Sequence, residues 1–276
     1  MYAPGKIHCG ECPYCRSGYE NYCPDTEGIG YDRPGALAEY VQLPTEPLRP
    51  VPEGVSDAEG AALQPLASSV LCVADAEIDP GDDVLVVGVG VMGFQCALLA
   101  KRFGAATVYA ADIRDCPLEL AAATGVVPID ATESDPVDAV REATDGVGVD
   151  VAIEAVGGDQ SHATDGDDPL AQAFRAVRRG GTVLQVGHIS GDVETTPRSA
   201  RSKAVRWENP RKGVAHLAPG TETGTLAGEL VESGAVPIGD YITHEFAGLD
   251  SFGTVVDVTL DKGAHDALGP AQIVLD

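Results

Sequence analysis

The sequence predicts an α/β protein in which a doubly wound parallel sheet is inserted into a smaller β-rich module. Three observations predict this fold. Apolar, β-branched runs alternate with helical patterns between Val84 and Val186, as in a parallel sheet with crossover helices. The first of these runs stops at a glycine-rich turn. Short runs bounded by proline and glycine stand at both ends of the chain, which is typical of short strands.

The composition is that of a globular protein with a strongly acidic surface. The 276 residues are 44% hydrophobic, and 43 acids against 18 bases give a net charge of −25. This charge disfavours a nucleic-acid partner and an acidic membrane surface. The acids are spread along the chain, and lysine is scarcer than arginine among the bases. This pattern is typical of halophilic proteins, and a merely acidic mesophilic protein is the alternative. Residues 1–8 lack the apolar core of a signal peptide, so we expect a cytoplasmic protein.

Four of the seven cysteines are crowded into residues 9–23, which read CGECPYCRSGYENYC. Four thiolates in one short loop can close a tetrahedral zinc site with no open position, which predicts a structural zinc. Without an export signal, metal ligands are favoured over disulfides. An iron–sulfur cluster is the alternative, but the bacterial ferredoxin run has a shorter last spacing than the seven residues found here. The predicted ligands are Cys9, Cys12, Cys15 and Cys23.

Short elements are expected between this lobe and the sheet. Alternation of apolar and polar residues in Ala38 to Leu43 predicts a strand. Ser56 to Leu63 predicts a helix with Ser56 as its N-cap and Glu59 at the third helical position. Residues 61–80 then predict an apolar helix that leads into the sheet.

The stretch 83–112 predicts a strand, a turn, a helix and a second strand in that order. The strands are the runs Val84 to Val87 and Thr107 to Ala111, and the helix runs from Val91 to Gly104. Three glycines, a glutamine and a turn inside residues 84–100 argue against a transmembrane helix there. A GxGxxG turn in this context is the fingerprint of a dinucleotide-binding Rossmann unit, although glycines kept for packing alone remain the alternative.

The turn reads Gly88-Val-Gly90-Val-Met-Gly93. Gly88 permits a tight turn, Gly90 leaves room for a pyrophosphate, and Gly93 lets the helix pack closely on the strand. The helix N-terminus favours the phosphates through its backbone N–H groups and its dipole. We therefore expect Val91 and Met92, in the first helical turn, to border the cofactor as well.

Asp112, at the end of the second strand, is expected to bind the ribose of the cofactor. Its carboxylate can accept hydrogen bonds from both ribose hydroxyls, which favours NAD over NADP. Arg114 could instead accept a 2′-phosphate, so the sequence leaves NADP open. Three residues at or just beyond the ends of later strands, Ala155, Gly157 and Gly187, complete the expected cofactor contacts.

The alternation of strands and helices continues after Asp112, with an acidic, turn-rich insertion at 158–168. The expected elements are a helix at 117–123, a strand at 126–129, a helix at 136–143, a strand at 149–155, a helix at 170–177, a turn at Gly180-Gly181 and a strand at 182–186. Beyond residue 220, helices are expected at 225–233 and near 251–259, and strands at 242–246 and 271–275 that could return to the β-rich module.

Residues 188–220 interrupt the alternation and hold a third of all the bases. Such a run could meet a phosphate or an acidic substrate, but a solvated loop is the favoured interpretation. The bases are Arg198, Arg201, Lys203, Arg206, Arg211 and Lys212.

Four segments together resemble the zinc-containing medium-chain alcohol and polyol dehydrogenases: the four-cysteine lobe, GVGVMG, GVGVDVAIEAVG and ITHEF. EGIGYDRPGALAEYV is most similar to the threonine and sorbitol dehydrogenase members. The resemblance implies a partial GroES-like domain made of residues 1–63 and 243–276, with a Rossmann domain at 64–242. It also implies hydride transfer from a secondary alcohol to NAD, with a second, catalytic zinc that lowers the pKa of the alcohol. A small alcohol is the implied partner, and a homo-oligomer is left open.

The sequence departs from this family at the catalytic zinc. In the family a cysteine and a histidine–glutamate pair precede the four-cysteine lobe, and this chain begins at Met1 just before the lobe, so the resemblance implies an N-terminally truncated relative. The later ligand position matches Gln64, whose neutral amide is a poor zinc ligand, and Cys72 is expected to pack in its helix. The histidines, in no ligand-like spacing, are His8, His162, His188, His216, His244 and His265.

We therefore assign no catalytic residue from the sequence. Two other functions stay open beside the dehydrogenase. One is a non-catalytic nucleotide-binding or interaction module that keeps the structural zinc. The other is a zinc-independent quinone reductase relative, which the four-cysteine lobe disfavours.

Overall fold

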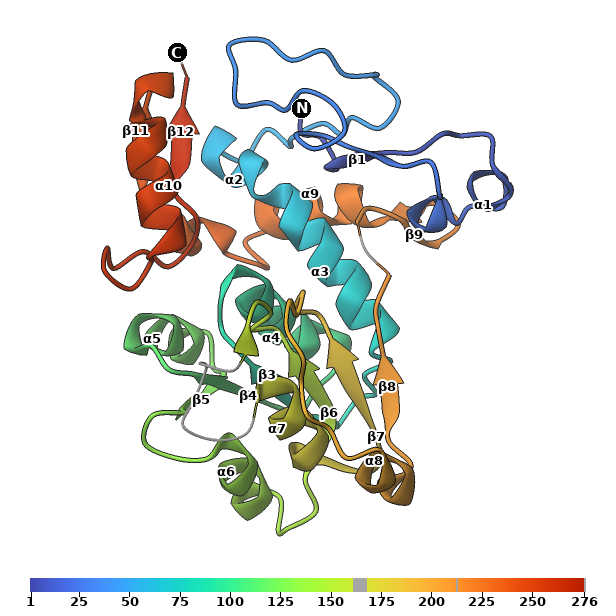
Figure 1. Ribbon diagram of the computed structural model, residues 1–276, viewed down its shortest axis with the longest axis vertical. Helices are drawn as coiled ribbons and strands as arrows, with labels where there is room; N and C mark the ends of the chain where they lie inside the picture. Colours follow the sequence, from blue (N-terminus) through green and yellow to red (C-terminus); the bar gives the residue numbers. More distant parts are fainter. Residues whose placement is uncertain (161–167, 212, 276) are drawn as a thin grey trace. The chain divides into compact units, whose positions relative to one another are not determined.

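The computed structural model describes residues 1–160, 168–211 and 213–275. The chain divides into two compact units (Figure 1). The first comprises Met1–Leu71 and Arg211–Asp276, and the second comprises Cys72–Pro210. The first division lies eight residues after the predicted boundary at 63/64, and the second lies 32 residues before the predicted boundary at 242/243. The assignment of 1–63, 64–242 and 243–276 to two domains stays a prediction.

The second unit is built on a six-stranded sheet with the order β5-β4-β3-β6-β7-β8, and every neighbouring pair in it is parallel. The chain starts at β3, moves outward to β5 and then returns to β6 on the other side of β3, so the predicted doubly wound sheet is confirmed. Its strands are β3 (Asp83–Val87), β4 (Thr107–Asp112), β5 (Val127–Asp130), β6 (Val149–Glu154), β7 (Val177–Gln185) and β8 (Arg206–Glu208). Its helices are α4 (Val91–Phe103), α5 (Asp115–Ala123), α6 (Pro136–Ala143), α7 (Pro169–Ala176) and α8 (Pro197–Lys203).

The central strands are buried on both faces, which explains their near-continuous apolar runs. Leu85 and Val87 of β3 belong to a core cluster with residues of α6 and α7. Val84 and Val86, which alternate with them, are also completely buried and point to the opposite face of the sheet. Helices therefore cover both faces, as Figure 1 shows for this unit.

The predicted turn at Gly180-Gly181 is wrong, because both residues lie inside the nine-residue strand β7. Gly180 has a φ of +73°, and the pairing of β6 with β7 shifts register between Val149 and Val151. A Cβ atom at Gly181 would lie 2.5 Å from the Asp150 carbonyl oxygen. The two glycines thus make a β-bulge in a continuing strand.

The basic segment 188–220 is not only a loop. It contains α8, the edge strand β8 and the short strand β9 (His216–Ala218). Two of its bases bind within the second unit: Lys203 Nζ donates to three carbonyl oxygens near the end of α7, and the Arg206 guanidinium pairs with Glu77. Lys212 and residues 161–167 of the predicted acidic insertion lie outside the described residues.

The first unit contains short strands that pair two by two in its described part. β1 (Lys6–Ile7) pairs with β2 (Glu27–Gly28), and β9 pairs with β10 (Thr221–Glu222). β11 (Glu245–Ala247) pairs in parallel with β12 (Gln272–Val274). The two strands predicted near the C-terminus therefore form a sheet of their own. The other elements of this unit are α1 (Pro13–Arg16), η1 (Glu20–Tyr22), α2 (Asp57–Ala61), α3 (Leu63–Asp75, which runs past Leu71), α9 (Thr223–Glu232), η3 (Ile238–Tyr241), η4 (Leu249–Ser251) and α10 (Phe252–Leu260).

The strand predicted at Ala38 to Leu43 is wrong, whereas the capped helix after it is confirmed. Residues 38–43 form no strand, and Tyr40 is 91% exposed; an alternating pattern without a neighbouring strand has no ladder to join. At α2, Ser56 Oγ accepts from the Glu59 N–H at 3.3 Å, and Glu59 Oε2 accepts from the Ser56 N–H at 3.0 Å. These two bonds form the predicted capping box.

We expect Lys203→Met to destabilise the second unit. Lys203 Nζ donates to the carbonyl oxygens of Val177, Phe174 and Arg175 at 2.7, 2.9 and 3.0 Å, and its removal leaves carbonyls at the end of α7 without this charged donor. The expected loss is about 1–3 kcal/mol in the free energy of unfolding, measured by urea denaturation. Arg201→Met, at an exposed position of the same helix, is the control. Equal stability of the two variants would contradict this capping role.

Candidate functional site

The turn between β3 and α4 has the geometry that each of its three glycines predicts. Gly88 has a φ of +90°, and a Cβ atom there would lie 2.7 Å from Val156 Cγ2. A Cβ atom at Gly93 would lie 1.8 Å from the Gly88 carbonyl oxygen, so only glycine allows the helix to approach the strand this closely. A Cβ atom at Gly90 would meet nothing within 4 Å. The fold itself therefore demands glycine at 88 and 93, while Gly90 borders open space.

The N-terminus of α4 is suited to an anion. Gly90 is its N-cap and provides no side-chain cap, and its first turn, which includes Val91 and Met92, holds no acid. The helix is 13 residues long, so its positive dipole end is fully developed at this turn. A phosphate group fits such a terminus in charge and in hydrogen-bonding character.

The structure brings Asp112 to the glycine turn. Asp112 Oδ2 accepts a hydrogen bond from the Val89 N–H at 2.7 Å, and Oδ1 accepts one from the Arg114 N–H at 3.0 Å. The Arg114 guanidinium lies 4.0 Å from the same carboxylate. Each carboxylate oxygen can accept more than one hydrogen bond, so Asp112 can still accept from a ribose hydroxyl.

The loops after β6 and β7 bring together the three remaining predicted cofactor residues. The Ala155 N–H donates to the Val87 carbonyl oxygen at 2.8 Å, which continues the pairing of β6 with β3 beyond the strand. Gly157 has a φ of +65°. A Cβ atom at Gly187 would lie 2.5 Å from the Gly157 nitrogen. Both loops therefore run together at the carboxyl end of the sheet, on the β6 side of the switch point.

Sequence reasoning gave no role to Glu154, although it ends β6 just before these loops. The residue is completely buried and its Oε1 accepts hydrogen bonds from Val156 and Gly157. An acid directly after the apolar run Val151 to Ile153, with a glycine loop following it, is the sequence signal that could have found it.

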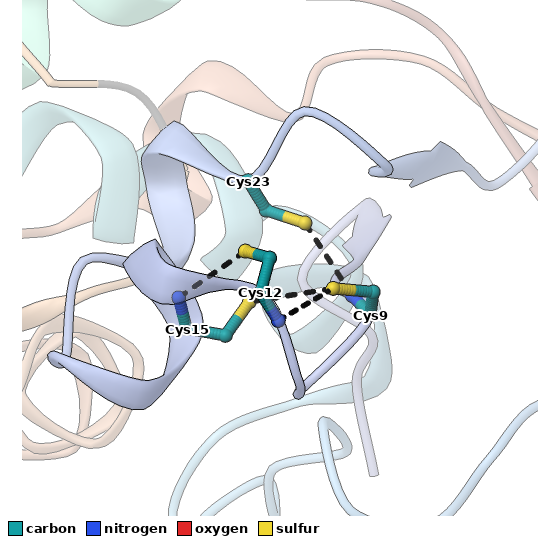
Figure 2. Close-up of side chains that lie close together, drawn as sticks. All are labelled: Cys9, Cys12, Cys15 and Cys23. Carbon is teal, nitrogen blue, oxygen red and sulfur yellow. Dashed lines mark hydrogen bonds between the residues drawn. The ribbon is translucent and has the colours of Figure 1, made fainter.

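The four predicted zinc ligands converge in the first unit. Their sulfur atoms all lie within 4.8 Å of one another, and Figure 2 shows them turned toward a common point. Tetrahedral zinc with Zn–S bonds of about 2.3 Å requires sulfurs about 3.8 Å apart, and the Cys9 and Cys15 sulfurs are 4.0 Å apart. The cluster therefore fits a closed structural zinc, held by Cys9, Cys12, Cys15 and Cys23.

The backbone around the lobe supports negative charge on these sulfurs. The N–H groups of Cys12, Cys15 and Cys9 donate to the sulfurs of Cys9, Cys12 and Cys23, at 3.3, 3.4 and 3.5 Å. The bond from the Cys9 N–H lowers the pKa of the Cys23 thiol to about 7, whereas loss of solvent raises the pKa of Cys15 to about 12. A bound divalent cation stabilises all four as thiolates.

The residues considered for a catalytic zinc do not converge. Among residues 1–160, 168–211 and 213–275, the four-cysteine lobe is the one group of three or more histidine, cysteine or acidic side chains close enough to share a metal. Gln64 lies next to Gly5, with its Cδ 3.6 Å from a Cβ atom placed there, and Cys72 is buried in α3 as expected. His8 contacts Thr26 and belongs to no such group, and His162 lies outside the described residues.

Two family models match this chain. Residues 88–209 match the model described as zinc-binding dehydrogenase, and residues 2–53 match the alcohol dehydrogenase GroES-like domain. The first match covers the glycine turn and the sheet strands β4 to β8, and the second covers the four-cysteine lobe.

Curated relatives agree with this assignment. An L-threonine 3-dehydrogenase of Deinococcus deserti is 31% identical over 93% of this chain and 70% of its own length. A probable D-xylulose reductase A of Aspergillus fumigatus is 33% identical over 98% of this chain and 73% of its own length.

Solved structures share the fold. The alcohol dehydrogenase TADH from Thermus sp. ATN1 superposes with a TM-score of 0.82 at 27% identity, covering 99% of this chain and 78% of that one. A zinc-binding dehydrogenase from Sinorhizobium meliloti 1021, solved bound to NADP, has a TM-score of 0.78 at 28% identity, covering 91% of this chain and 70% of that one.

The fold and the sites thus define a zinc-binding, NAD(P)-dependent oxidoreductase. The chain belongs to the zinc-containing medium-chain alcohol and polyol dehydrogenase family. Among the residues that the structure describes, no helix combines the length and the apolar character needed to cross a bilayer.

We expect Cys12→Ser to lower zinc content and to loosen the lobe, because a serine oxygen replaces one of four thiolates. Zinc per chain, measured by inductively coupled plasma mass spectrometry, should fall well below the wild-type value, and protease cleavage within 9–23 should become faster. NAD affinity should stay unchanged. Cys116→Ser, at an exposed cysteine outside the lobe, is the control. Iron in place of zinc in the wild-type protein would refute the metal assignment.

Proposed function

We propose that this chain carries the cofactor-binding and structural-zinc parts of a dehydrogenase that oxidises a secondary alcohol and prefers NAD to NADP. The observation that carries this proposal is the glycine turn with the Asp112 carboxylate hydrogen-bonded to its backbone at Val89. Such a turn supports a pyrophosphate, and an acid at this place supports a ribose with free hydroxyls.

The chain's own residues bind and orient the cofactor. The N-terminus of α4 would hold the pyrophosphate over Gly90, and Asp112 would accept from the adenosine ribose. The loops that contain Ala155, Gly157 and Gly187 would border the other half of the dinucleotide. Bound NAD supplies the hydride acceptor.

Two groups compete to set the cofactor preference. The Asp112 carboxylate repels a 2′-phosphate, whereas the Arg114 guanidinium attracts one. The Asp112 carboxylate is held at the turn by the Val89 and Arg114 N–H groups, so we take this fixed charge as the stronger determinant at the ribose. The Sinorhizobium relative was solved bound to NADP, so the affinities of this chain for NAD and for NADP both need to be measured.

The substrate class rests on the relatives. One is a threonine dehydrogenase and another is a xylulose reductase, so a hydroxy amino acid or a polyol is the proposed substrate of this chain. The net charge of −25 supports adaptation to concentrated salt, since hydrated carboxylates keep a protein soluble there.

A second function, a nucleotide-binding module without dehydrogenase chemistry, is favoured by one observation. In the described part of the chain the four cysteines are the one metal-competent cluster, and Gln64 stands at the position that matches a family zinc ligand. A catalytic zinc therefore does not fit the described residues.

We expect Asp112→Ala to weaken NAD binding on the order of tenfold or more, because hydrogen bonds to a charged group are lost. NADP binding should weaken less or improve, so the ratio of NAD affinity to NADP affinity should fall. Asp112→Asn is the comparison variant, because it keeps one acceptor oxygen while it removes the charge and replaces the other oxygen with an amide donor. Isothermal titration calorimetry measures both affinities. Tighter NADP than NAD binding by the wild-type protein would show that Arg114 decides instead.

We expect residues 1–276 to bind NAD and to oxidise alcohols slowly at best, because the described residues offer no second metal site. A zinc ion that stabilises an alkoxide contributes several kcal/mol to catalysis. The assay follows NADH absorbance with threonine, sorbitol or butanediol, with and without added zinc. Rapid zinc-dependent NADH formation would exclude the non-catalytic module.

A further inference from the structure

Glu154 is a completely buried carboxylate at the carboxyl end of β6. Its Oε1 accepts three hydrogen bonds, from the Val156 N–H at 2.8 Å, the Gly157 N–H at 2.9 Å and Gln160 Nε2 at 2.7 Å. Its Oε2 has no hydrogen-bond partner among the described residues. Burial raises the pKa of Glu154, and the three donors act in the opposite direction. Burying a carboxylate costs folding free energy, so we asked what Glu154 contributes at this position.

The carboxylate lies where the loops after β6 and β7 meet. A Cβ atom at Gly187 would lie 2.6 Å from Glu154 Oε2, so the second loop passes directly over the carboxylate. The Gly158 N–H donates to the His188 carbonyl oxygen at 2.8 Å, and the Ser190 N–H donates to the Gly158 carbonyl oxygen at 2.9 Å. The two loops are therefore joined to each other above Glu154, and the side chain fixes the first of them through its backbone.

Gln160 extends this link to the next helix. Its side chain is 3% exposed, and its Oε1 accepts from the Leu170 N–H, in the first turn of α7, at 3.1 Å. Glu154 also fixes Val156 by its backbone, and Val156 Cγ2 fills the space next to Gly88. One buried carboxylate thus connects the end of β6, the start of α7 and the glycine turn.

The topology tells which half of a dinucleotide these loops would meet. In a doubly wound sheet the two halves of the cofactor lie on the two sides of the switch point. The β3–β4 side holds the glycine turn and Asp112, which suit the pyrophosphate and the adenosine ribose. The β6–β7 side holds the Gly157 and Gly187 loops, and so takes the nicotinamide half.

We propose that Glu154, together with Gln160, is a positioning residue that holds the loops after β6 and β7 in the shape that accepts the nicotinamide half of the cofactor. This inference rests on the proposed function. It predicts a selective effect: loss of the carboxylate should weaken ligands that carry nicotinamide more than ligands that lack it. A role in stability alone would weaken both kinds of ligand equally or neither.

The test compares NADH with ADP-ribose, which lacks the nicotinamide ring, by calorimetry on the full chain. The wild-type protein should bind both. Glu154→Leu should weaken NADH on the order of tenfold, with ADP-ribose changed by less than about twofold. Glu154→Gln keeps one acceptor oxygen for the three donors and should restore most of the NADH affinity.

Gln160→Leu provides an independent variant that leaves the carboxylate in place, so the test does not depend on whether Glu154→Leu folds. It should also weaken NADH selectively. Equal losses for NADH and ADP-ribose, or unchanged NADH binding in the variants, would overturn the inference while the proposed function stands. Failure of the wild-type protein to bind either ligand would contradict the proposed function itself.

Discussion

The close approach of α4 to β3 is the constraint on which the second unit depends. The helix can begin directly over the strand end only because Gly93 has no Cβ atom to meet the Gly88 carbonyl oxygen, which would be 1.8 Å away. The same approach places the Val89 N–H within 2.7 Å of the Asp112 carboxylate. A turn needed for packing thereby lies beside a helix N-terminus and open space at Gly90, an arrangement that suits a phosphate group.

The four-cysteine lobe is organised by a different principle. It has little apolar core of its own: Tyr14, Tyr19 and Tyr22 are each about half exposed and contact one another at ring distances of 6.1 and 6.2 Å. A segment with so little buried apolar surface needs another source of order, and metal binding by four thiolates can supply it. The two sites are thus held by separate forces in separate units of the chain.

Much of this arrangement could be predicted because it depends on local patterns. Patterns among neighbouring residues predict the strands that are buried on both faces, the capping box at Ser56 and the cysteine cluster from Cys9 to Cys23. The failures share a physical cause, since each depends on a distant neighbour. The run 38–43 has the pattern of a strand but no partner. Lys203 caps carbonyls that lie 26–29 residues away, and Glu154 lies under the loop after β7, where Gly187 passes over its carboxylate.

Gly90 offers the most direct test of the central claim, that the glycine turn exists to hold a dinucleotide. Its φ of −69° suits any residue, and a Cβ atom there meets nothing within 4 Å, so the fold does not require glycine. Gly90→Val should cost only about 1 kcal/mol of stability from a poorer N-cap, while its side chain occupies the space of the pyrophosphate. Calorimetric titration with NAD should show binding by the wild-type protein and none by this variant, with similar urea unfolding curves. Equal NAD affinity in both proteins would contradict the claim.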